Sequence, residues 1–235
     1  MKLLAARHWV AVMTAMVLGI AVIATAEEAA GPVKPFNGKD LTGWKLRGDA
    51  AKSQWVVGTA KLDPDNSAKL AVEPGGSDLI NKSTGLDMYT EEKFGDCIVT
   101  LDVMVPKGSN SGIYLQGEYE LQVLDSYGKE KDFSPGDMGG IYGAAPPKNP
   151  VYKKPGEWQS FEIQFQAPKF DDAGKKTANA KFVKVVLNGV TIHENVEAKG
   201  PTGGQLGPEV AKGPLMFQGN HGPVAFRNIE IKPLK

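Results

Sequence analysis

Residues 109–128 hold the densest set of side chains that could do chemistry, because carboxylates, amides and tyrosines alternate there with apolar residues. Successive side chains of a β-strand point to opposite faces. In a strand over residues 118–124, Glu118, Glu120 and Gln122 therefore share one face. Two carboxylates at this spacing lie about 6–7 Å apart at Cα, and their repulsion raises the pKa of one of them. The pattern indicates a site for proton transfer.

The preceding segment adds polar groups to the same face. Its apolar positions alternate with Tyr114 and Gln116, and Gly117 provides a tight connection to the next strand. A solvated outer face is the alternative, but such a face usually includes lysine, and this one has none. The sequence favours a functional face with these members: Tyr114, Gln116, Glu118, Glu120 and Gln122.

Comparison with retaining β-sandwich glucanases argues against an ordinary two-carboxylate glycosidase. Those enzymes carry Glu-x-Asp-x-x-Glu on one strand, and their paired carboxyls lie about 5–5.5 Å apart. Here the strand has Glu118, Glu120 and then Gln122. An amide cannot transfer a proton as an acid, although the two glutamates alone would be enough for such a pair.

A second polar cluster lies near the C-terminus, at residues 217–229. Gln218 and Asn220 share one face of a predicted strand, and His221 follows in a turn, where a histidine is a polar surface residue or a catalytic group. Arg227 lies among apolar residues, which is typical of an arginine paired with a carboxylate, and it is also a candidate substrate contact.

No cofactor is expected from these residues. Glu120, Asp125 and His221 could meet around a divalent metal, but no spacing typical of metal ligands is present. The single cysteine, Cys97, cannot form an internal disulfide and lies in an apolar run, so it is expected to be a small buried residue.

The surrounding sequence predicts an all-β protein. Short segments rich in β-branched and aromatic residues are bounded by Gly, Pro, Asn or Asp, and Asn188-Gly189 is a hairpin signal. One turn of helix is expected at residues 90–94. Many short strands with regular turns are typical of a sandwich or barrel. The predicted strands are residues 53–57, 60–62, 69–72, 78–81, 97–105, 110–116, 118–124, 158–166, 181–187, 215–220 and 224–232.

Two long segments, residues 126–157 and 197–213, resist assignment to strands because they are rich in glycine. The first also contains Tyr142 and other large apolar residues, more than a disordered segment tolerates. We expect it to be an ordered loop over a binding face.

Residues 1–26 have the features of an export signal: Lys2 and Arg7, then an uncharged apolar run, then small residues at a cleavage site. A retained membrane anchor is the alternative, but the run is short for a span of about 20 residues. A linker at 27–35 and one domain at 36–235 would follow. No later segment is apolar enough to cross a membrane. The full sequence has a formal net charge of 0, which does not indicate nucleic-acid binding.

The chain resembles the 3-keto-disaccharide hydrolase domain family, formerly a domain of unknown function. The resemblance runs through residues 36–44, 110–115, 118–128, 140–143, 156–158, 187–190, 222 and 226–231. It implies a concanavalin A-like jelly-roll β-sandwich of two antiparallel sheets. It also implies export and hydrolysis of glycosides whose sugar is oxidised at C3, with an oxidised sugar as the binding partner.

The implied chemistry needs only one carboxylate base. A ketone at C3 acidifies the proton at C2; its removal lets the group on C1 leave, and water then adds. Glu120 is the expected base, with Glu118 and Asp125 as the next candidates. Gln122 and His221 would polarise the ketone. The remaining expected sugar contacts are Tyr114, Gln116, Tyr142, Gln218 and Arg227.

The main alternative function is a non-catalytic, lectin-like carbohydrate-binding module. It would use the same sandwich and the same polar strand face. A conventional glucanase and a purely structural surface protein rank below it. The sequence makes no prediction about the oligomeric state.

Overall fold

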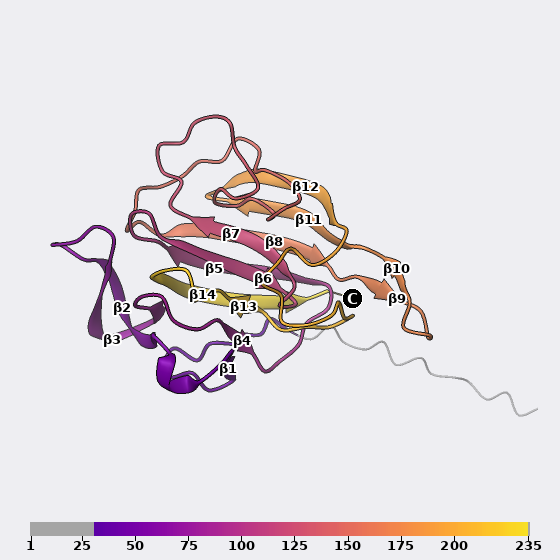
Figure 1. The fold of residues 1–235 in the computed structure, drawn as a ribbon, viewed down its shortest axis with the longest axis horizontal. Coiled ribbons are helices and arrows are strands. Elements are labelled where there is room, and N and C mark those ends of the chain that lie inside the picture. The colour runs from indigo at the N-terminus through magenta and orange to yellow at the C-terminus, as the bar shows by residue number, and fades with distance from the viewer. Residues whose placement is uncertain (1–30, 235) are drawn as a thin grey trace, which may run out of the picture.

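The computed structural model describes residues 31–234, which form an almost all-β fold of two large antiparallel sheets (Figure 1). This confirms the predicted sandwich. The first sheet has five strands, in the spatial order β1 (Trp44–Leu46), β4 (Met88–Thr90), β13 (Met216–Phe217), β6 (Asn110–Leu115) and β7 (Tyr119–Leu124).

The second sheet has seven strands and supports the first. Their spatial order is β12 (Val190–Ala198), β11 (Ala180–Leu187), β8 (Gln159–Gln166), β5 (Cys97–Met104), β14 (Val224–Pro233), β3 (Leu70–Asn81) and β2 (Trp55–Leu62). A small ribbon of β9 (Lys169–Phe170) and β10 (Lys176–Ala178) extends from one end, and the single 3₁₀ turn of the described residues is Ala50–Lys52.

The core lies between the two sheets, where aromatic rings from both sheets stack. Phe217 of β13 and Phe226 of β14 have ring centroids 3.9 Å apart. Trp44 stacks on Phe217 at 5.3 Å, and Trp55 stacks on Phe226 at 6.3 Å. Burial of these large rings joins the sheets and needs no disulfide. Cys97 is also buried, and burial raises the pKa of its thiol to about 12.

The period-two pattern predicts the inner and outer faces of β7 correctly. Tyr119, Leu121 and Val123 belong to the core, so the side chains between them face away from it. The Asn188-Gly189 hairpin is confirmed, because both residues have positive φ between β11 and β12. The helical turn expected at residues 90–94 is wrong: β4 extends to Thr90, and no helix follows it.

Two segments cover the outer face of β6 and β7. The first, the long loop (residues 126–157), lies along the edge of β7, where Gly139 N donates to Gln122 O at 2.8 Å and Gln122 N donates to Gly140 O at 2.8 Å. It is ordered, as expected, and it buries Met138 and Ile141. The second, the strap (residues 199–213), joins β12 to β13. Leu206 N of the strap donates to Gly117 O at 2.9 Å.

The expected signal at residues 1–26 and the first part of the linker at 27–35 lie outside the described residues. Within residues 31–234, no helix is long and apolar enough to cross a membrane.

Candidate active site

A hollow of about 300 Å³ lies on the outer face of the five-stranded sheet. This volume is within the range of small-molecule binding sites. The sheet provides its floor, the strap one wall and the long loop another. Its lining residues are Asn110, Tyr114, Glu120, Gln122, Tyr142, Gly203, Gly204, Gln218 and His221. The structure thus brings together Tyr114, Glu120, Gln122, Tyr142, Gln218 and His221 of the sequence-predicted set.

The register of β6 and β7 fixes the neighbours of Glu120 in this hollow. Tyr114 lies directly opposite Glu120, and Gly112 lies opposite Gln122. The Glu120 carboxylate occupies the space that a side chain on Gly112 would need, since a Cβ there would overlap with Glu120 Oε1. A glycine at 112 therefore leaves room for the carboxylate.

The electrostatic environment of Glu120 suits a base near neutral pH. Burial raises the pKa of Glu120 to about 7, with a further rise from the charge of Asp87 and an opposing hydrogen bond from Tyr114. Only 4% of the residue is exposed. At this pKa the carboxylate is a stronger base than an exposed glutamate, and about half of it is ionised at neutral pH.

Amide groups around Glu120 have unused hydrogen-bonding capacity. Gln218 Nε2 donates to the Tyr114 hydroxyl at 3.2 Å, and Gln122 Oε1 accepts from Val123 N at 3.1 Å. Among residues 31–234, the buried oxygens Asn110 Oδ1 and Gln218 Oε1 have no partner. Buried polar atoms are almost always hydrogen-bonded, so these two acceptors fit the hydroxyl groups of a ligand.

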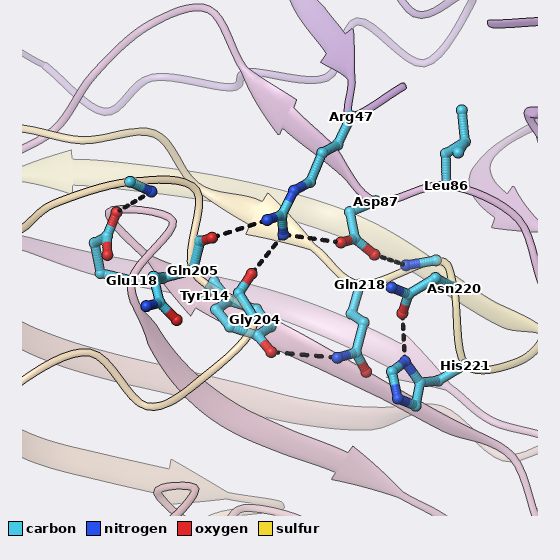
Figure 2. Close-up of polar contacts among 12 residues, drawn as sticks. Arg47, Leu86, Asp87, Tyr114, Glu118, Gly204, Gln205, Gln218, Asn220 and His221 are labelled. Carbon is cyan, nitrogen blue, oxygen red and sulfur yellow. Dashed lines mark hydrogen bonds and ion pairs between the residues drawn. The ribbon is translucent and has the colours of Figure 1, made fainter. Parts of the chain in front are cut away.

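His221 lies at the exposed end of the hollow. Its Nδ1 is hydrogen-bonded to Oδ1 of the adjacent Asn220 (Figure 2). This bond places the proton of the neutral ring on Nδ1, because the amide oxygen can only accept. The Nε2 atom is then an acceptor in the neutral ring and a donor in the imidazolium form.

Sequence reasoning missed Arg47, which follows β1 and holds the strap over the hollow. Arg47 Nη1 donates to Gly204 O at 2.6 Å, and Nη2 donates to Gln205 O at 2.9 Å. Figure 2 shows the guanidinium between these carbonyls and Asp87. The Asp87 carboxylate lies 3.5 Å from Arg47 Nη1 and accepts from Gly219 N at 3.0 Å.

This Arg47–Asp87 clamp therefore links the strap to the segment that bears Gln218 and His221. Neither residue has a local pattern that marks it. Each lies beside a short strand, and only the sheet topology brings them to the site.

Glu118 does not line the hollow. Gln116 and Gly117 both have positive φ, so a tight turn occupies the end of the hairpin, and β7 begins only at Tyr119. Glu118 Oε1 accepts from Gly207 N of the strap at 3.2 Å, and burial raises the pKa of this carboxyl to about 7. Figure 2 shows Glu118 at the opposite end of the drawn cluster from His221.

Three other predicted site residues also lie elsewhere. The Gln116 amide donates to the backbone oxygens of Phe94 and Ala211 and so fixes the turn. Asp125 accepts from the backbone N–H groups of Gly108 and Tyr127, and it does not line the hollow. Arg227 lies on β14 of the seven-stranded sheet, where it contacts Asp102 at 3.1 Å and the ring of Trp158 at 4.1 Å. As its apolar neighbours suggested, Arg227 pairs with a carboxylate.

The set Glu120, Asp125 and His221 is not assembled around one point. Within residues 31–234, no three His, Cys, Asp or Glu side chains are placed to hold a metal ion. The carboxylate of the hollow is instead surrounded by a phenol and amides.

Comparison with known proteins identifies the family. The sequence profile of the 3-keto-alpha-glucoside-1,2-lyase-like domain matches residues 31–232. The chain belongs to this family. None of the curated proteins matches the chain.

Solved structures with the same fold include two proposed glycosyl hydrolases from one organism. A crystal structure of a proposed glycosyl hydrolase from Parabacteroides distasonis ATCC 8503 is 29% identical with a TM-score of 0.67, over 87% of this chain and 84% of that chain. A second such structure from the same organism is 20% identical with a TM-score of 0.60, over 87% and 94% of the two chains. Family and fold together associate the chain with glycosyl hydrolase-like proteins.

Proposed function

We propose that this protein cleaves glycosides whose sugar ring carries a ketone at C3, with Glu120 as the base. The observation that carries this proposal is a single buried carboxylate, of raised pKa, facing a hollow lined by amides and a phenol. Such a site lacks the second carboxylate of an ordinary glycosidase. It suits a substrate that is already activated for proton loss, and the family description names a 1,2-lyase.

The reaction begins with transfer of the C2 proton to the Glu120 carboxylate. The electron pair of the C2–H bond moves toward the C3 ketone and gives an enolate. The enolate then forms the C1=C2 double bond, the C1–O bond breaks, and the leaving oxygen takes a proton from solvent. Addition of water, with hydroxyl to C1 and a proton to C2, completes hydrolysis. No oxidant, reductant or metal ion is needed.

The other residues of the hollow would bind the sugar and stabilise the enolate. Gln122 Oε1 is used by the backbone, which leaves its Nε2 as a donor for the C3 oxygen. His221, at the exposed end of the hollow, would also bind the ketone. Asn110 Oδ1 and Gln218 Oε1 would accept from sugar hydroxyls. The exposed ring of Tyr142 would stack on the sugar.

The decisive experiment is incubation with methyl 3-keto-α-D-glucopyranoside in EDTA, followed by product analysis. We expect release of methanol, with either 3-keto-glucose or its 1,2-unsaturated precursor. Glu120→Gln should reduce turnover by about 10²–10⁴-fold while substrate binding persists. Full turnover by this variant would eliminate Glu120 as the base. Binding of unoxidised oligosaccharide with no product from any keto sugar would favour the carbohydrate-binding module instead.

The sequence at residues 1–26 supports a further proposal, that the protein is exported. Mass analysis of the mature protein from its native cell tests this directly. Cleavage after Ala26 is the expected result, and a retained N-terminus would contradict it.

A further inference from the structure

We infer that Asn81 is a positioning residue for the candidate active site, because its side chain fixes the turn that carries His221. The part of this inference that concerns activity rests on the proposed function. Asn81 is the last residue of β3 and is fully buried. It shares a face of that strand with Leu79, which belongs to the core. Its amide reaches the connection between β13 and β14, the site turn (residues 218–223).

The Asn81 amide binds both ends of the site turn. Its Nδ2 atom donates to Gly219 O and to Gly222 O, each at 2.8 Å. Residues 220–221, which include the site histidine, lie between these two carbonyls. A third acceptor, Ser83 O, lies 2.7 Å from the same nitrogen. Since an amide group has two hydrogens, two of the three carbonyls share one of them.

The two ends of the site turn have separate further anchors. At the first end, Gly219 N donates to Asp87 Oδ1 at 3.0 Å, and Gly85 N donates to Gly219 O at 2.8 Å. At the second end, Ser109 Oγ donates to Pro223 O at 2.5 Å. The Asn81 amide contacts both ends and therefore determines how far apart they lie.

The location of the His221 ring depends on this backbone. Asn220 and His221 are both exposed, so packing restrains their side chains little, although the two are hydrogen-bonded to each other (Figure 2). Gly219 and Gly222 on either side are buried. If the site turn opened, the ring would move relative to Glu120, which lines the same hollow.

The choice of an amide at position 81 is not explained by packing alone. Within the described part of the chain, Asn81 Oδ1 is a buried oxygen with no hydrogen-bond partner. Such an atom is unfavourable for stability, and an apolar side chain would avoid it. The useful part of the group is the nitrogen, which joins the two ends of the site turn.

Backbone relaxation measured by NMR tests the inference without any substrate. Asn81→Leu and Asn81→Ser both remove the Nδ2 atom. We expect the order parameters of the Asn220 and His221 amides to fall from about 0.85 in the wild-type protein to below about 0.6 in both variants. Ile80→Val is the control. Ile80 is the preceding residue, and it is equally buried but packs in a separate cluster with Ala225 and Met104, so it should lose packing without loosening the turn.

Kinetics then test whether Asn81 acts through His221. The value of kcat/KM for methyl 3-keto-α-D-glucopyranoside should fall by up to about 10²-fold in Asn81→Ser, because a misplaced group in the site slows the reaction. In a His221→Ala background the same substitution should have little further effect, since residues that act together are not additive. Equal fold-losses in the two backgrounds would overturn the positioning role.

Failure of the proposed function would be distinguishable from failure of this inference. If the wild-type protein cleaves no keto sugar, the proposed function fails, and the relaxation data decide the role of Asn81 in the site turn by themselves. Rigid Asn220 and His221 amides in a folded Asn81 variant would overturn it. If neither variant folds, scalar couplings in the wild-type protein from Asn81 Nδ2 to the carbonyl carbons of Gly219 and Gly222 are the test. We expect both couplings, and the absence of either would overturn the inference.

Discussion

The carboxylate of Glu120 packs directly over the backbone of Gly112, on the neighbouring strand. A Cβ at position 112 would overlap with Glu120 Oε1 and would lie 2.9 Å from Cε2 of Tyr114. The absence of a side chain at one position thus determines where the candidate base lies. This relationship connects a packing requirement of the sheet to the chemistry of the hollow.

Gly112→Ala should therefore impair activity more than stability. The added methyl group must displace the carboxylate, and a small misplacement of a reacting group costs about 10²-fold in rate. Overpacking should cost about 1–3 kcal/mol of unfolding free energy. Rate measurements and denaturant unfolding check both expectations. Gly136→Ala is the control, since a Cβ there has ordinary space and its φ is not positive. Normal activity of Gly112→Ala would contradict this packing.

The pH dependence of kcat/KM should report the ionisation of Glu120. The base must be deprotonated, and burial raises its pKa to about 7, so activity should rise with pH through this range. The hydrogen bond from Tyr114 lowers the Glu120 pKa. Tyr114→Phe should therefore move the apparent pKa upward. An unchanged or lower value in this variant would show that another group controls the profile.

Glu120 should also make the folded state less stable at high pH. Its folded pKa of about 7 exceeds the ordinary value of 4.5, so the folded protein binds more protons between these two pH values. Stability then falls as pH rises through that window. Glu120→Gln removes this effect and should stabilise the protein by on the order of 1–3 kcal/mol at pH 8 relative to pH 4. Denaturant unfolding at the two pH values checks the sign; greater stabilisation at pH 4 would contradict it.

Arg47 is expected to be a positioning residue for the strap. Arg47→Met retains the length of the side chain but loses both bonds to the carbonyls of Gly204 and Gln205. Hydrogen exchange should accelerate at Leu206 and Gly207, and KM should rise more than kcat falls. Lys45→Met is the control, because Lys45 is exposed and pairs only with Glu91. Unchanged exchange in the strap would argue against the clamp.

Much of the fold follows from the sequence because strand periodicity is local. Alternation along residues 119–124 predicts which side chains enter the core and which face away from it. Tyr119, Leu121 and Val123 do enter the core, and Glu120 and Gln122 line the hollow. The prediction fails where the strand ends. Glu118 lies in the turn before β7, so the period of two no longer determines its direction.

The rest of the site depends on contacts between distant segments. Arg47 and Gly204 are 157 residues apart, yet they share a 2.6 Å hydrogen bond. Asp87 likewise reaches Gly219 across 132 residues. No spacing rule predicts such pairs, because the order of strands in the sheet brings them together. Arg227 shows the opposite case, in which residues close in sequence lie apart in the fold. It follows the C-terminal polar cluster in sequence, but it lies on the seven-stranded sheet and pairs with Asp102.

The candidate base lies on a strand, whereas two walls of the hollow around it belong to irregular connections, the long loop and the strap. Connections of this kind tolerate insertion and exchange better than sheets do. Relatives could therefore diversify in the leaving groups they accept while retaining the same proton abstraction. Grafting these two connections between relatives would transfer substrate preference and leave the reaction unaltered.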